Sequence, residues 1–187
     1  MRMKYRTGAR KDGIITGVDA KILIDGGSLL WSMGDAALGG LGWSVDSGGD
    51  VDGDGIPDIL VHSLWAPHPV GFGQGACVIL SGRDGAISRI LYLNIPYTTS
   101  TAGRKIASAG DVDADGHDDI LAGFVHTSTG YETQLISGFT GNLIRTYFEF
   151  STWFGTSVAA AGDVDQDGVP DQIVGAAGSE KVYVYSG

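Results

Sequence analysis

Three copies of one aspartate-rich loop constrain this chain more than any other feature. The loops span residues 50–58, 111–119 and 163–171, and each reads Asp-x-Asp-x-Asp-Gly-x-x-Asp. Their starting points are separated by 61 and then 52 residues, so a unit of about that length recurs along the 187-residue chain. Recurrence on this scale indicates a fold built from repeated supersecondary units.

The sequence around each loop repeats as well and predicts four β-strands per unit. A glycine lies eight residues before each first aspartate, at Gly42, Gly103 and Gly155, and leads into a strand. The apolar runs that follow the loops are residues 59–61, 120–122 and 173–175, then 78–82, 135–138 and 182–187. A fourth run follows in two units, at 87–93 and 143–148. The 31 glycines against five prolines suit short strands joined by tight turns.

Four-stranded units of this length predict an all-β fold made of β-propeller blades, with antiparallel strands in each blade. Residues 20–187 would form three such repeats, and residues 1–19 an N-terminal extension. Three blades are fewer than the usual four to eight that close a ring. The chain is therefore either half of a six-bladed propeller completed by a homodimer, or a truncated piece of a longer protein.

The two ends of the chain complement each other. The third unit stops at Gly187, where its fourth strand should begin, while residues 21–31 match a third and a fourth strand of the template. This arrangement predicts a homodimer in which the N-terminal strand of each copy completes blade three of the other.

The loops predict calcium sites. Aspartates at positions 1, 3, 5 and 9, with a backbone carbonyl at position 7, offer the several oxygen ligands that calcium accepts at flexible angles, and the glycine at position 6 allows the tight turn. About three ions per chain are expected, with a structural role. The predicted ligands are Asp50, Asp52, Asp54, Ile56 and Asp58; Asp111, Asp113, Asp115, His117 and Asp119; and Asp163, Asp165, Asp167, Val169 and Asp171.

An EF-hand loop begins in the same way, but it requires a glutamate at position 12 and flanking helices. Position 12 is held here by Val61, Ala122 and Val174, and the flanks are rich in β-forming residues. With position 9 as the last ligand, the loops resemble the calcium sites of FG-GAP repeats in integrin-type β-propellers. Residues 154–177 carry the best match, with the FG pair, the loop and a near-GAP segment.

Other functional classes find little support. The net charge of −10 argues against a nucleic-acid partner, since no basic cluster could neutralise phosphates. Cys77, the only cysteine, is expected to be a buried apolar residue. We expect no enzyme activity, because His62, His68, His117 and His126 lack catalytic spacing and are expected in loops or at the surface. Asp118 is expected to be a solvated neighbour of the second loop.

The sequence also bears on location. The N-terminus lacks the apolar segment of a signal peptide, and no run of 18 apolar residues occurs, so no membrane partner is expected. The resemblance implies an extracellular or cell-surface protein if the chain is a fragment of a secreted one.

The resemblance further implies a module for adhesion or for recognition of protein or carbohydrate. A longer connection in blade one, residues 64–72, should project from the end opposite the calcium loops. A recognition surface is expected from Trp65, His68, Phe72, Tyr97 and Tyr131. An accessory domain of a carbohydrate-active enzyme and a purely structural scaffold remain alternatives.

Overall fold

The computed structural model describes residues 8–9, 15–16, 32–66, 75–93, 105–125, 131–150 and 153–187. Within these ranges the chain is all-β apart from one short 3-10 helix, η1 (Ala177–Ser179). No helix among the described residues is long and apolar enough to cross a membrane. The predicted all-β class is confirmed.

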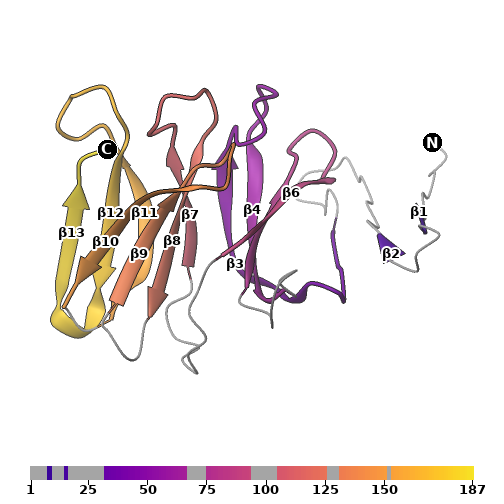
Figure 1. The fold of residues 1–187 in the computed structure, drawn as a ribbon, viewed down its shortest axis with the longest axis horizontal. Coiled ribbons are helices and arrows are strands. Elements are labelled where there is room, and N and C mark those ends of the chain that lie inside the picture. The colour runs from indigo at the N-terminus through magenta and orange to yellow at the C-terminus, as the bar shows by residue number, and fades with distance from the viewer. Residues whose placement is uncertain are drawn as a thin grey trace, which may run out of the picture.

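Three antiparallel sheets stand side by side (Figure 1), and we name them blades one, two and three in chain order. Blade one contains β3 (Gly39–Gly49), β4 (Asp58–Trp65), β5 (Ala76–Leu80) and β6 (Ile87–Tyr92). Blade two contains β7 (Lys105–Gly110), β8 (Asp119–Val125), β9 (Tyr131–Ile136) and β10 (Leu143–Glu149). Blade three contains β11 (Phe154–Gly162), β12 (Asp171–Ala176) and β13 (Lys181–Tyr185). Strands β1 (Gly8–Ala9) and β2 (Ile15–Thr16) form a separate two-stranded sheet.

The strand content matches the predicted repeat. Blades one and two have four strands in sequential order, and blade three has three, as expected from the point where the third repeat stops. Residues 21–31, predicted to supply the fourth strand to a second copy, lie outside the described residues. Strand exchange therefore stays a prediction, and so does the domain boundary at residue 20.

In blades one and three, the glycine that precedes the loop by eight residues marks a bulge in the first strand; Gly103 of the second unit lies outside the described residues. The register between β3 and β4 shifts across Gly42, and that between β11 and β12 shifts across Gly155. These glycines have φ of 87° and 79°, a conformation that residues with a side chain rarely adopt. The repeated glycine is therefore explained by backbone geometry rather than by ligand binding.

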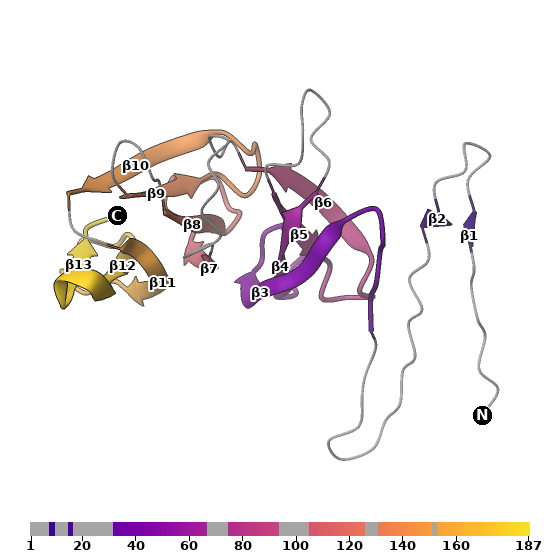
Figure 2. The same ribbon diagram turned by 90° about the horizontal axis from the view of Figure 1, so that it is seen from below.

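A separate apolar cluster fills each junction between blades. Between blades one and two it contains Val51, Leu60, Cys77, Ile79, Leu93, Ile106, Ile120, Ala122 and Ile136. Between blades two and three it contains Ala109, Leu121, Leu135, Tyr147, Phe154, Val174 and Ala176. The first strand of each later blade, β7 or β11, packs on the sheet of the blade before it (Figure 2). Cys77 is buried, as predicted.

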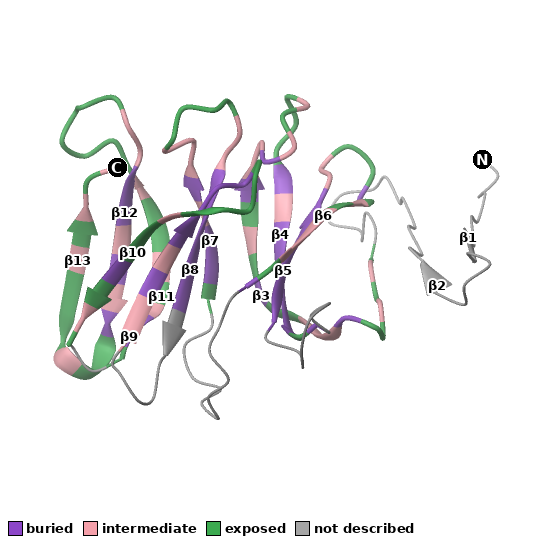
Figure 3. Ribbon diagram, viewed as in Figure 1, coloured by how far each residue is buried: buried purple, intermediate pink, exposed green. Residues whose placement is uncertain are grey.

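The two outer faces of the stack are less well covered. Val45 in blade one is 64% exposed, whereas Ile106, at the same repeat position in blade two, is 4% exposed. Leu38 and its neighbours shield only part of that face of blade one. On blade three Val184 is 53% exposed, whereas its counterpart Leu135 in blade two is fully buried. Figure 3 shows β13 largely exposed, in contrast to the buried inner strands of the stack.

Candidate metal centres

The three acidic loops lie at the same end of the three blades (Figure 1). Residues 50–58 lead from β3 into β4, residues 111–119 from β7 into β8, and residues 163–171 from β11 into β12. We name them loops one, two and three and number their positions 1 to 9 from the first aspartate. Each loop is therefore the same connection, between the first and second strands of its blade.

Two positions of each loop have a left-handed backbone. The glycines at position 6, which are Gly55, Gly116 and Gly168, have φ of 82°, 88° and 93°. Position 4 is left-handed too, although Ala114 and Gln166 occupy it in loops two and three, with φ of 59° and 64°. Sequence reasoning found the first position through its repeated glycine but missed the second, where only loop one has a glycine.

The aspartate at position 1 organises the turn. Asp50 Oδ1 accepts a hydrogen bond from the Asp54 N–H at 2.9 Å, and Oδ2 accepts one from the Gly55 N–H at 2.8 Å. Asp111 and Asp163 accept the same pair of bonds in their own loops. The aspartate at position 3 also accepts from the N–H of position 5, at 3.2 Å in every loop. The backbone thus curls around its own carboxylates and fixes where they point.

The aspartate at position 9 joins the loop to the third strand of the blade. Asp58 Oδ2 accepts from the N–H groups of positions 2 and 3 at 3.0 and 2.9 Å, and Oδ1 accepts from the Gly82 N–H at 3.1 Å. Asp119 and Asp171 make the equivalent three bonds. All three side chains are buried, so these bonds replace the water that the carboxylates lose.

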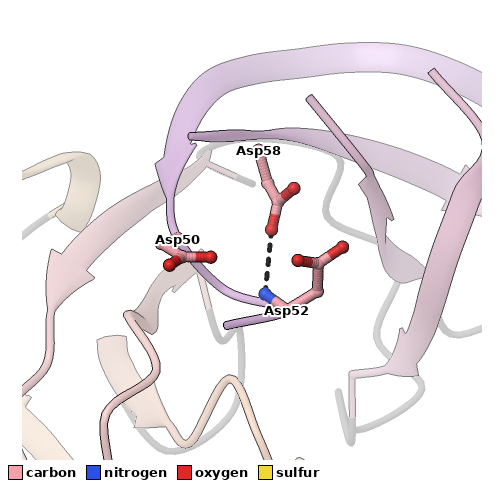
Figure 4. Close-up of side chains that lie close together, drawn as sticks. All are labelled: Asp50, Asp52 and Asp58. Carbon is pink, nitrogen blue, oxygen red and sulfur yellow. Dashed lines mark hydrogen bonds between the residues drawn. The ribbon is translucent and has the colours of Figure 1, made fainter. Parts of the chain in front are cut away.

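Three carboxylates of each loop bring one oxygen each within 4.8 Å of one another. The sets are Asp50, Asp52 and Asp58; Asp111, Asp113 and Asp115; and Asp163, Asp165 and Asp171. Figure 4 shows the first set, with the hydrogen bond from the backbone of Asp52 to Asp58. A cluster of oxygens alone suits a hard cation such as calcium or magnesium. The residues present therefore fit a metal ion.

The other predicted ligands are not members of these three sets. Position 5 pairs with a neighbour in two loops, because Asp54 Oδ2 lies 2.9 Å from Arg83 Nε and Asp167 Oδ2 accepts from the Ser186 hydroxyl at 3.3 Å. Asp119, at position 9 of loop two, is outside the converging set. At position 7, Ile56, His117 and Val169 donate their N–H groups to the aspartate at position 5.

The position 9 carboxylates differ in acidity although their bonds are alike. Burial raises the pKa of Asp58, and it raises the pKa of Asp119 to about 6. The pKa of Asp171 is instead lowered, chiefly by the hydrogen bond from the Val164 N–H. Loop two lies between two blades, whereas loop three borders an open face of the stack, so desolvation outweighs the hydrogen bonds at Asp119 but not at Asp171.

Asp118 is not the solvated neighbour that the sequence led us to expect. Its Oδ2 accepts a hydrogen bond from the Asp50 N–H at 2.9 Å, and its own N–H donates to the Asp50 carbonyl at 3.1 Å. The prediction was wrong because blade two packs with position 8 of its loop against the start of loop one. A contact across 68 residues leaves no local signal in the sequence.

The histidines need a second correction. His62 lies on β4 and is 1% exposed, rather than in a loop or at the surface, because β4 is an inner strand of its sheet. His117 is in loop two as expected, and its Nδ1 lies 3.0 Å from the Val51 carbonyl oxygen. His68 and His126 lie outside the described residues.

Two arginines join neighbouring blades and were missed. Arg89 Nη1 on β6 donates to the Gly138 carbonyl of blade two at 2.6 Å, and Arg145 Nη1 on β10 donates to the Ser186 carbonyl of blade three at 2.7 Å. Both arginines occupy the third residue of a fourth-strand run. Their recurrence at one repeat position was a signal that could have found them.

The predicted recognition surface is only partly described. Trp65, at the end of β4 far from loop one, is 60% exposed, and Tyr131 at the start of β9 is half-buried. The other three residues of that surface, His68, Phe72 and Tyr97, lie outside the described residues. The surface stays a prediction.

Comparison with known proteins identifies the repeat. The FG-GAP repeat family matches residues 41–76 and 154–185. Integrin alpha-IIb of Mus musculus is 33% identical over 165 residues, which cover 73% of this chain and 15% of that protein. Integrin alpha-7 of Rattus norvegicus is 31% identical over 175 residues, covering 82% and 14%. Integrin alpha-5 of Xenopus laevis is 28% identical over 209 residues, covering 93% and 18%.

The chain thus spans less than a fifth of the length of these relatives. Blade two lies between the matched segments and shares their loop, its hydrogen bonds and the register shift directly before the loop, between Ser108 and Gly110. From the matched repeats, the shared loop geometry and the integrin relatives together, we conclude that this chain belongs to the FG-GAP repeat family of the integrin alpha type.

Proposed function

We propose that this chain is a calcium-binding β-propeller segment that acts as a recognition or adhesion module. The observation that carries the proposal is that one nine-residue loop folds in the same way three times, with three carboxylate oxygens of each loop within 4.8 Å. Clustered carboxylates repel one another unless a cation neutralises them. A divalent ion in each loop supplies that charge.

Calcium fits these loops better than magnesium. Calcium accepts six to eight oxygens at flexible angles, whereas magnesium requires a strict octahedron and keeps much of its water. Each loop offers the carboxylates of positions 1, 3, 5 and 9 and the carbonyl of position 7, so about three ions bind per chain. In loop two, His117 would supply the carbonyl and Asp119 the position 9 carboxylate. The ions hold the loops in their folded form, which is a structural role.

Recognition is the function that the family resemblance implies, and it rests on analogy of fold. Trp65, at the end of blade one opposite the loops, is exposed and belongs to the predicted surface for a protein or glycan target. This proposal includes an extracellular or cell-surface location and no enzyme activity.

A second copy of the chain is the proposed partner for the open faces of the stack. Inside the chain, the first strand of a blade packs twice on the sheet of the blade before it. The exposed Val45 face of blade one and the exposed Val184 face of blade three repeat the two sides of that junction. Residues 21–31 of the copy would add the fourth strand beside β13. Light scattering in millimolar calcium should give twice the chain mass, and a single chain mass would refute the dimer.

Thermal unfolding with and without calcium tests the central proposal. An ion that binds only the folded state adds about 2.7 kcal/mol at a hundredfold excess over its dissociation constant. For three ions, a rise in Tm of about 10 °C or more is expected over the same protein in EGTA. The matched control is the triple variant Asp50→Asn, Asp111→Asn and Asp163→Asn, which should lose the rise. Equal Tm values in calcium and EGTA would contradict the proposal.

Binding screens test the recognition role separately. Glycan arrays and pull-down from extracellular fractions, each run in calcium and in EGTA, should show a target that is lost on chelation. Trp65→Ala should weaken binding to that target without changing Tm. A protein that binds calcium but finds no target in either screen would be a structural scaffold.

A further inference from the structure

We propose that loops one and two bind calcium as a coupled pair, in which Asp118 of loop two positions the first ligand of loop one. This inference rests on the calcium function proposed above. It adds a property that the repeated loop sequence does not predict, because the residue responsible is outside the shared pattern of aspartates.

Asp118 of loop two contacts the backbone of Asp50 in loop one. The Asp118 carboxylate accepts the Asp50 N–H at 2.9 Å, and the Asp118 N–H donates to the Asp50 carbonyl at 3.1 Å. The two bonds hold both polar groups of the Asp50 backbone. Since the Asp50 carboxylate is the position 1 ligand of loop one, its approach to an ion depends on where loop two places Asp118.

The contact between the two loops extends to position 2 of loop one. His117 Nδ1 lies 3.0 Å from the Val51 carbonyl oxygen, and the His117 ring stacks on Phe139 of the same blade at 4.5 Å. Close approach is required as well, because a Cβ at Gly53 would lie 2.4 Å from His117 Cε1. Positions 7 and 8 of loop two therefore pack against positions 1, 2 and 4 of loop one.

In loop two, position 8 lies between two predicted ligands. His117, at position 7, would supply a carbonyl and donates its N–H to Asp115 at 3.0 Å, and Asp119 follows Asp118 directly. An ion in loop two fixes these neighbours and with them His117 and Asp118. Occupation of loop two thus prepares loop one, and thermodynamic linkage requires loop one to favour loop two by the same factor.

Position 8 of loop three cannot make the two hydrogen bonds that Asp118 makes in loop two. The residue there is Pro170, which has no N–H to donate and no carboxylate to accept. The proline ring faces Gly110, where a Cβ would lie 2.7 Å from Pro170 Cγ. Loops two and three therefore touch through an apolar contact that holds no ligand backbone, and loop three serves as an internal control.

The experiment is a calcium titration of the 1–187 chain followed by NMR. The N–H groups of Gly55, Gly116 and Gly168 each donate to the first aspartate of their own loop, so each amide signal reports one site. We define the midpoint of a signal as the calcium concentration at which half of its change has occurred. Asp111→Asn combined with Asp113→Asn should raise the midpoint of the Gly55 signal about tenfold. The matched change in loop three, Asp163→Asn with Asp165→Asn, should move that midpoint less than about twofold.

Asp118→Pro tests the residue itself. Proline already occupies position 8 in loops one and three, as Pro57 and Pro170, so it suits the loop while removing both bonds to Asp50. We expect the Gly55 midpoint to rise about tenfold, the Gly168 midpoint to stay unchanged, and loop one to stop responding to loop two. Asp118→Asn keeps the N–H and an acceptor oxygen, so it should retain most of the coupling.

The outcomes separate this inference from the calcium function. If all three amide signals respond to calcium but the Gly55 midpoint is the same with and without the loop-two substitutions, the coupling is overturned and the calcium function stands. No response at any of the three signals would overturn the calcium function. An unchanged Gly168 midpoint shows that a variant is folded, and if Asp118→Pro does not fold, the loop-two double variant decides.

Discussion

Loops two and three have the same pattern of aspartates and the same hydrogen bonds at position 9, yet they lie in different surroundings. Asp119 and Asp171 each accept from positions 2 and 3 of their loop and from the glycine after the third strand. The pKa of Asp119 is raised to about 6, and that of Asp171 is lowered. Loop two is enclosed by its neighbouring blades, and loop three borders an uncovered face. The shared pattern of aspartates therefore sets the shape of the site, while the adjoining blade sets its electrostatics.

The glycine before each loop should show the largest effect of an adjoining blade. Gly49 and Gly162 have similar φ, 64° and 72°, but a Cβ at Gly49 would lie 1.6 Å from Asp118 Oδ2 and a Cβ at Gly162 meets nothing within 4 Å. Gly49→Ala combines a steric clash with backbone strain and should lower the free energy of unfolding by about 3 kcal/mol. Gly162→Ala adds strain alone and should lower it by about 1 kcal/mol. Urea denaturation in EGTA measures both.

Gly110 provides the control for this comparison. It has φ of 75°, and a Cβ there would lie 2.7 Å from Pro170 Cγ, so Gly110→Ala should fall between the other two variants. The series must be measured at a protein concentration that separates any dimer, because a second copy could cover Gly162. Equal losses at Gly49 and Gly162 would mean that backbone strain, not the neighbouring blade, determines the effect.

Calcium affinity should depend on pH in loop two and much less in loop three. Protons compete with calcium for Asp119, whose pKa in the calcium-free fold is about 6, so affinity at loop two should fall about tenfold between pH 7 and pH 5. The pKa of Asp171 lies below its ordinary value, so loop three should change less than about twofold over that range. Titrations followed at the Gly116 and Gly168 amides compare the two loops directly.

The same pKa shifts predict the stability of the calcium-free protein. Asp119 has a higher pKa folded than unfolded, so its proton uptake favours the fold and stability should rise as pH falls from 7 to 5. Asp171 has a lower pKa folded, so its contribution is lost only as pH falls below about 4. Asp119→Asn should remove most of the change between pH 7 and 5.

In the calcium titrations between pH 7 and pH 5, an equal loss of calcium affinity in loops two and three would contradict the difference assigned to Asp119 and Asp171.

Repetition explains which parts of the fold could be predicted from the sequence. Each blade is a local unit, so the strands, the loop and the missing fourth strand of blade three follow from patterns within about 50 residues. The aspartate positions also follow, since the turn is built from its own carboxylates. Because the contacts within a blade are local and the unit occurs three times, its three copies can be compared with one another within a single sequence.

The junctions between blades could not be predicted in the same way. Asp118 meets Asp50 across 68 residues and His62 is buried by its place in the sheet, so neither environment can be read from neighbouring residues. Arg89 and Arg145 are the exception, because both recur at one repeat position. The difference between loops two and three is absent from their shared pattern and depends on the blades packed against them.

The smallest predicted effect concerns position 4, where loops two and three should behave alike. Ala114 and Gln166 have φ of 59° and 64°, a region that is strained for residues with a Cβ. Replacing either with glycine relieves that strain but makes the unfolded chain more flexible, so a net gain of about 0.5 kcal/mol is expected for Ala114→Gly and for Gln166→Gly. Urea denaturation of both variants in EGTA measures the gain. Because the strain belongs to the loop itself, a gain in only one of them would show that the adjoining blade controls the backbone as well as the charge.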